Sequence, residues 1–205
     1  MSKIIKKIFD GGAINRVIVY LTLSDMIIVS GWGLVSPILA IFWSKQIIGG
    51  SIELAGFAAT TFLLIKSLGQ IPIARFIDKT DGEKDDFWIM ISGSLIISLA
   101  AFLYAFARFP WHVIGLQVLY GAGAALAFPS WIAIFTRHID KKQEGFQWSL
   151  YSTSTGLGAA AAASVGGILA STIGYRPLFL IVGTFSLVGT LFLAGIANKL
   201  ICKKS

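Results

Sequence analysis

The sequence predicts an all-α membrane protein with six transmembrane helices, and three observations lead to this prediction. The chain is 56% hydrophobic and only 13% charged, with a mean hydropathy of +0.79, which is too apolar for a soluble domain of this size. Its apolar residues form six runs that each reach the ~20 residues needed to cross a bilayer as a helix. The charges gather in the short breaks between the runs. We therefore expect one membrane domain over residues 1–205.

The predicted helices follow the apolar runs in order, and each ends where a charged or turn-forming stretch begins. The breaks are SKQIIGGS after the first run, RFIDKTDGEKDD after the second, ARFP after the third, RHIDKKQEG after the fourth and TIGYR after the fifth. No break is long enough for a separate soluble domain. The six predicted helices span residues 17–42, 52–74, 87–107, 111–136, 146–171 and 177–197.

The placement of lysine and arginine predicts the orientation in the membrane. Of the 17 such residues, only Lys45, Arg108 and Arg176 fall on one side of the six helices, and Lys66 lies inside the second helix. Loops rich in lysine and arginine stay in the cytoplasm, so the side with most of the basic residues is predicted to be cytoplasmic. We expect a protein of the cytoplasmic (inner) membrane with both ends in the cytoplasm. These ends are the N-terminal segment 1–16 and the tail 198–205.

A weak internal repeat is visible in the first and fourth predicted helices. GWGLVSP at 31–37 has Gly-x-Gly followed by a proline, and GAGAALAFP at 121–129 repeats this with a longer spacer. Three helices separate the two copies, so the second crosses the membrane in the opposite direction. An inverted repeat of three plus three helices is common in secondary transporters. Glycine and proline are also common in transmembrane helices in general, and the pair alone fits this explanation equally well.

Three stretches of the chain resemble one half of a transporter of the major facilitator superfamily. The first helix contains GWGLVSPIL, similar to the glycine-rich first helix of the family, and LQVLYGAG and SVGGILASTIGYRPLF resemble its fourth and fifth helices and the following loop. ARFIDKTDGEK, after the second helix, resembles the cytoplasmic signature of the family. The residues that match this gate motif are Asp78, Lys79, Gly82 and Lys84.

The sequence also departs from the family pattern. Ala74 replaces the first glycine of the gate motif, and one extra residue precedes Gly82. Gln117 stands where members that move protons often carry an arginine. Ala162 and Ala163 stand near the position of a Gly-Pro pair that marks the antiporter subgroup.

The resemblance implies secondary active transport by alternating access, with a second half that completes the twelve helices of the family. A parallel homodimer would supply that half through a twofold axis along the membrane normal. The stretch GLGAAAAASVGG in the fifth helix favours this, because small residues let helices approach closely in lipid. Packing within the chain is the other explanation of this face, and a different partner subunit is the other source of the second half.

Asp25 and Lys66 are predicted to lie at the same depth in the membrane. Asp25 follows Arg16 by nine residues and Lys66 precedes Arg75 by nine, which places both about 13 Å from the cytoplasmic boundary. A buried ion pair between them would reduce the burial cost of each charge. Charged groups inside a membrane usually mark substrate or ion pathways. We therefore predict a role in proton coupling, with a purely structural role in helix packing as the alternative.

The predicted cavity carries aromatic, amide and hydroxyl side chains but few charges. Aromatic faces stack on sugar rings and amides offer paired hydrogen bonds, so a small polar, sugar-like solute is favoured. Export of a drug or another amphipathic compound is the alternative. The predicted substrate-binding residues are Trp32, Ser36, Gln117, Phe128, Gln147 and Tyr151.

An enzyme is not predicted. His112 and His138 fall at opposite faces of the membrane, without a nucleophile or a phosphate-binding loop beside them. The single cysteine, Cys202, lies in the tail and excludes a multi-cysteine metal site. Neither a cofactor nor a metal is expected, and the scattered basic clusters do not suit nucleic acid. The expected partners are a small-molecule substrate, a proton or other coupling ion, and the lipid bilayer.

Overall fold

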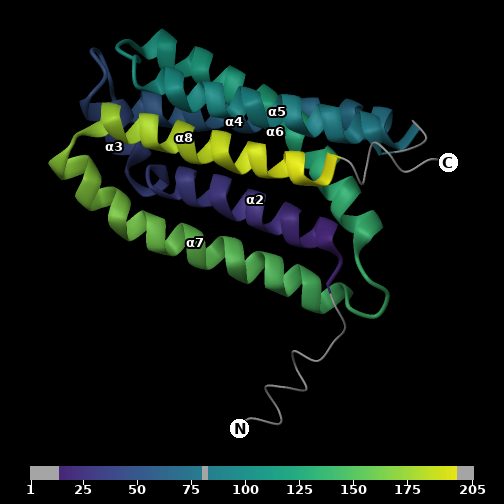
Figure 1. Ribbon diagram of the computed structural model, residues 1–205. Coiled ribbons are helices and arrows are strands. Elements are labelled where there is room, and N and C mark those ends of the chain that lie inside the picture. The colour runs from purple at the N-terminus through teal and green to yellow at the C-terminus, as the bar shows by residue number, and fades with distance from the viewer. Residues whose placement is uncertain (1–13, 80–82, 198–205) are drawn as a thin grey trace, which may run out of the picture.

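The computed structural model describes residues 14–79 and 83–197, and this part of the chain forms helices without any strand. Six of its segments are long and apolar enough to cross a membrane, as the sequence predicts. Figure 1 shows them as one bundle, in which α2, α7 and α8 form one group and α4, α5 and α6 the other. The elements are α2 (Arg16–Gly33), the 3-10 turn η1 (Ser36–Ile38), α3 (Leu39–Lys45), α4 (Ile52–Lys79), α5 (Lys84–Tyr104), α6 (Pro110–His138), α7 (Glu144–Thr172), α8 (Tyr175–Leu193) and the 3-10 turn η2 (Ala194–Ile196).

The first span is broken, whereas the sequence predicts one continuous helix over 17–42. α2 ends at Gly33, η1 begins at Ser36, and α3 carries the chain on from Leu39. Pro37 causes the break, because it has no N–H to donate and its ring clashes with the preceding helical turn. The whole span still runs from α2 to the end of α3.

The predicted loop between the second and third helices is largely helical. α4 continues to Lys79, and α5 already begins at Lys84. Hydropathy detects only the apolar middle of a helix, whereas the polar ends beyond the bilayer keep their helical hydrogen bonds. α6 and α7 are longer than predicted for the same reason. The third helix ends earlier, at Tyr104, and the last ends at Leu193 before the turn η2.

The helices pair in a pattern that is consistent with an inverted repeat. α2 packs mainly against α7 and α8, α6 packs mainly against α4 and α5, and α5 packs against α8. Exchanging the first three spans with the last three leaves these pairings unchanged. The first and fourth spans, α2 and α6, therefore occupy corresponding central places.

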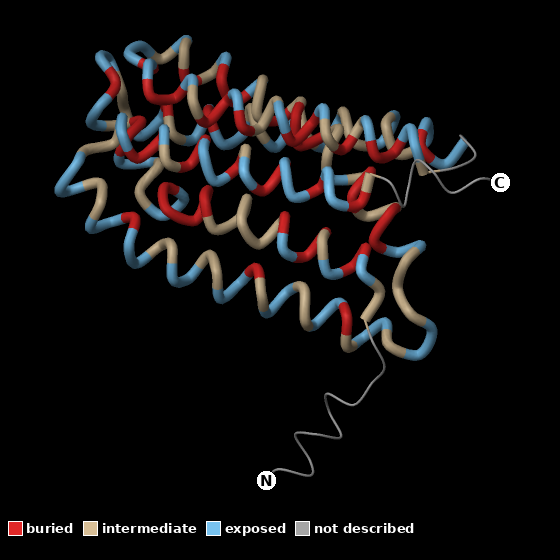
Figure 2. The backbone as a smooth tube through the Cα atoms, in the orientation of Figure 1, coloured by how far each residue is buried: buried red, intermediate tan, exposed pale blue. Residues whose placement is uncertain are grey.

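Helices α4 and α7 are the least buried of the six. Only 11% of the most apolar window of each is buried, compared with at least 39% in the other spans. Exposed residues follow nearly the whole length of α7 in Figure 2. The outer faces of α4 and α7 are therefore available for contact with lipid or with another chain.

The glycines of α7 lie on two different faces of the helix. Gly158 and Gly166 face α2, where a Cβ on Gly166 would collide with the carbonyl oxygen of Leu34. Gly156 and Gly167 are exposed and have open space where a Cβ would stand. Packing within the chain thus uses part of the small-residue stretch, and the rest lies on the outer surface.

Candidate functional site

A cavity of about 670 Å³ lies among α2, α4, α6 and α7, with further walls from α5 and α8. This volume suits a drug-sized molecule. We call it the central cavity. The sequence-predicted residues on its walls are Asp25, Trp32, Ser36, Lys66, Phe128 and Tyr151.

Asp25 is held by Tyr151 across the contact between α2 and α7. The Tyr151 hydroxyl donates a hydrogen bond of 2.6 Å to Oδ2 of Asp25. A hydrogen bond to a carboxylate is among the stronger ones in a protein, and it reduces the penalty for placing the charge inside the bundle. Asp25 therefore faces the cavity with one carboxylate oxygen bound by a neutral donor.

Asp25 and Lys66 line the same cavity without forming the ion pair that the sequence suggested. Within the described residues, the ion pairs join Arg137 to Asp86 and His138 to Glu83. The ammonium of Lys66 instead lies 4.4 Å from the ring centroid of Phe128 and 6.0 Å from that of Phe62. Cation–π attraction to these rings replaces the expected carboxylate partner.

Aromatic rings form most of the remaining wall. Tyr120 stacks between Trp32 and Phe62, with ring centroids 4.1 Å and 4.6 Å apart. Trp131 lies 4.6 Å from the ring of Tyr151. Sequence reasoning missed Phe62, Tyr120 and Trp131. The two on α6 share one helical face, and their eleven-residue spacing, three turns, was the available signal.

The two predicted glutamines lie elsewhere. Gln117 is 3% exposed and sits beside the buried hydroxyl of Tyr104, away from the cavity wall. Gln147 is fully buried where α7 begins, and its Nε2 donates a hydrogen bond of 2.7 Å to Oδ2 of Asp140. Gln147 therefore stabilises the loop between α6 and α7 by binding a side chain of that loop.

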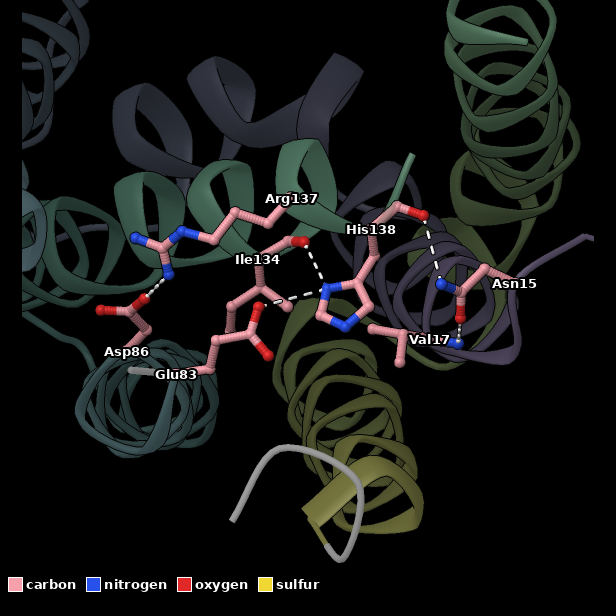
Figure 3. Close-up of polar contacts among 7 residues, drawn as sticks. All are labelled: Asn15, Val17, Glu83, Asp86, Ile134, Arg137 and His138. Carbon is pink, nitrogen blue, oxygen red and sulfur yellow. Dashed lines mark hydrogen bonds and ion pairs between the residues drawn. The ribbon is translucent and has the colours of Figure 1, made fainter. Parts of the chain in front are cut away.

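Polar contacts join three helices at the predicted cytoplasmic end of the bundle (Figure 3). Arg137 at the end of α6 pairs with Asp86, whose side chain is fully buried at the start of α5. His138 Nδ1 lies 3.3 Å from a carboxylate oxygen of Glu83 and 3.0 Å from the carbonyl oxygen of Ile134. Both neighbours are acceptors, so this nitrogen carries the proton. Asn15 extends the network to α2 by donating from Nδ2 to the carbonyl oxygen of His138.

The gate motif predicted from the sequence falls at the ends of α4 and α5. Asp78 and Lys79 lie in the last turn of α4, and Lys84 is the first residue of α5. Gly82 lies outside the described residues. Asp78 also lines a second cavity of about 560 Å³ between α4 and α6, together with Arg137.

No group of three or more histidine, cysteine, aspartate or glutamate side chains that could hold a metal ion occurs in the part of the chain that the structure describes. The side chains that line the central cavity offer aromatic rings, hydroxyls, one carboxylate and one ammonium.

The sequence of this chain matches a known protein family and a known protein. The model of the Major Facilitator Superfamily matches residues 21–198. The protein named Multi-drug resistance efflux pump PmrA homolog from Lactococcus lactis subsp. lactis (strain IL1403) is 28% identical over 163 residues, which cover 79% of this chain and 39% of that protein. The chain thus spans about two fifths of the length of that relative. Because the family match covers most of the chain and the six membrane helices correspond to half of such a transporter, the chain belongs to the Major Facilitator Superfamily.

Proposed function

We propose that this chain forms the transport cavity for amphipathic aromatic compounds, which it exports by alternating access. The observation that carries the proposal is the central cavity itself, whose walls combine stacked aromatic rings with one carboxylate and one ammonium. Flat apolar molecules bind such walls by stacking, and an ionisable group on the molecule finds a partner in Asp25 or Lys66.

A sugar-like solute is the second candidate and has less support. The sequence favours a sugar through aromatic stacking and through paired hydrogen bonds from amides, but neither Gln117 nor Gln147 lies on the cavity wall. The relative that is named a multi-drug efflux pump favours the amphipathic class. We include Asp25 in the proposal as the proton-coupling group, since it is the carboxylate that faces the cavity.

The proposed working unit is a parallel homodimer in the cytoplasmic membrane, with both ends of each chain in the cytoplasm. The cavity reaches the surface of this chain, because Ser36, Pro37 and Phe128 line it and are also exposed. The exposed helices α4 and α7 flank this opening. A second copy would cover it with the same surfaces, and the outer face of α7, with Gly156 and Gly167, allows close approach.

Transport of a fluorescent aromatic cation tests the substrate class. We expect liposomes that contain the protein to move ethidium down its gradient and to leave labelled glucose unmoved. Trp32→Ala should reduce ethidium transport about tenfold, because it removes one ring of the stack, worth roughly 1.5 kcal/mol. Trp111→Ala is the control, since Trp111 is 68% exposed and lines neither cavity. Movement of glucose but not ethidium would refute the proposal.

The mass of the protein in lipid nanodiscs, corrected for lipid, tests the homodimer. We expect two copies per particle. A single copy at every accessible concentration would contradict the homodimer and would direct the search to a partner chain.

A further inference from the structure

The second cavity adjoins the central cavity at one side chain. It lies between α4 and α6, has a volume of about 560 Å³, and extends toward Asp78 and Arg137 at the predicted cytoplasmic end. Phe128 lines both cavities, and they have no other lining residue in common. The Phe128 ring is therefore the point at which the two cavities meet.

Lys66 holds the Phe128 ring in its dividing position. Its ammonium lies 4.4 Å from the ring centroid, close enough for cation–π attraction. The contact joins α4 to α6, and these two helices also form the walls of the second cavity. The cation belongs to a long, flexible side chain, and the Phe128 ring remains 45% exposed.

Both walls of the second cavity contain a proline within the helix. Pro129 follows Phe128 directly in α6, and Pro72 lies in α4 beside Ile71, which lines the cavity. An in-helix proline removes one backbone hydrogen bond and lets the helix bend at that level. The two helices can thus change their separation near the dividing ring.

The lining of the second cavity resembles a passage more than a tight binding site. Its walls are mostly apolar, with Ile71, Ala74, Ile132 and Ala133 among them, whereas its outer rim carries charged and polar side chains. An amphipathic compound fits this combination, because its apolar part meets the walls and its polar group meets the rim.

We propose that the second cavity is the cytoplasmic chamber of the transport path, that it takes the same amphipathic aromatic compounds as the central cavity, and that Phe128 divides the two. This inference rests on the proposed function. It adds the route by which a compound reaches the central cavity and names the residue that controls the passage.

Cysteine labelling tests the chamber. In a Cys202→Ser background, Ala133→Cys and Thr136→Cys each place a thiol on its wall. We expect both to react with a membrane-impermeant maleimide added from the cytoplasmic side, and ethidium to slow both reactions at least about threefold by occupying the chamber. Lys141→Cys, at an exposed loop position, should react at the same rate with and without ethidium.

The outcomes separate the two proposals. If the protein transports ethidium but ethidium protects neither thiol, the chamber is refuted and the proposed function stands. If neither the unmodified protein nor the Cys202→Ser protein transports ethidium, the proposed function fails, and the dividing role of Phe128 is still tested by a measurement that needs no substrate.

That measurement uses Val29→Cys, a thiol on the wall of the central cavity. We expect Phe128→Ala to increase its labelling rate from the cytoplasmic side at least about fivefold, because the removed ring leaves an opening. Lys66→Met should give a smaller increase, since the ring loses its cation. Phe192→Ala is the matched control, because Phe192 is 42% exposed and lines neither cavity. An unchanged rate in Phe128→Ala would refute the dividing role.

Discussion

Replacement of Gly166 by alanine is expected to destabilise the folded bundle more than any other single methyl group added to α7. The new Cβ would collide with the carbonyl oxygen of Leu34, which is backbone and cannot rotate away. α2 and α7 would have to separate at the point where α2 has just ended. Overpacking of this kind costs about 1–3 kcal/mol. Thermal unfolding in detergent should show a clear fall in Tm.

Gly167→Ala is the matched control for this experiment. A Cβ at Gly167 meets nothing within 4 Å, and alanine is the better helix former by roughly 1 kcal/mol in a soluble helix. We expect its Tm to equal or exceed that of the unmodified protein. Equal losses in the two variants would mean that α2 and α7 do not pack through Gly166.

Replacement of Asp25 by asparagine is expected to abolish accumulation of ethidium driven by a pH gradient. Asparagine has nearly the same shape but carries no exchangeable acidic proton, so the proposed coupling is lost while the cavity keeps its form. Accumulation should fall at least about tenfold, equivalent to 1.4 kcal/mol. Exchange of ethidium across the membrane at equal pH should stay within about twofold of the original rate. Liposomes with an imposed pH gradient provide the measurement.

Tyr151→Phe separates coupling from local structure. It removes the hydroxyl that donates to Asp25 but keeps the aromatic ring and the carboxylate. We expect accumulation to persist with a shifted pH dependence, because the acid has lost a donor that favours its charged form. Full accumulation in Asp25→Asn would exclude Asp25 as the coupling group.

The six spans are predictable because hydropathy and length decide whether a helix can cross a bilayer. The helix ends are less predictable. Lys79 and Lys84 are charged, yet both belong to helices, since the polar end of a helix needs no apolar side chains. The break at Gly33 depends on the single proline that follows it, and proline in a transmembrane helix does not always interrupt it.

The cavity was predictable in part. Asp25 and Lys66 are conspicuous charges within apolar runs, and the structure places both on the cavity wall. Gln117 and Gln147 have the chemistry of substrate-binding residues, but the packing of a helix against its neighbours decides which of its side chains face the cavity. On α6 the cavity face contains Tyr120 and is rotated away from Gln117, which packs into the core.

The order in which the helices pair also bears on how the chain is synthesised. α2 packs mainly on α7 and α8, which leave the ribosome later than α2 does. Asp25 precedes Tyr151 by 126 residues, a delay of roughly 6 to 25 s at ordinary translation rates. During that interval the first helix holds an acid, without its hydroxyl partner, at a depth where a charge costs at least ~2.5 kcal/mol. We therefore expect the insertion machinery to shield α2 until α7, which carries Tyr151, has emerged.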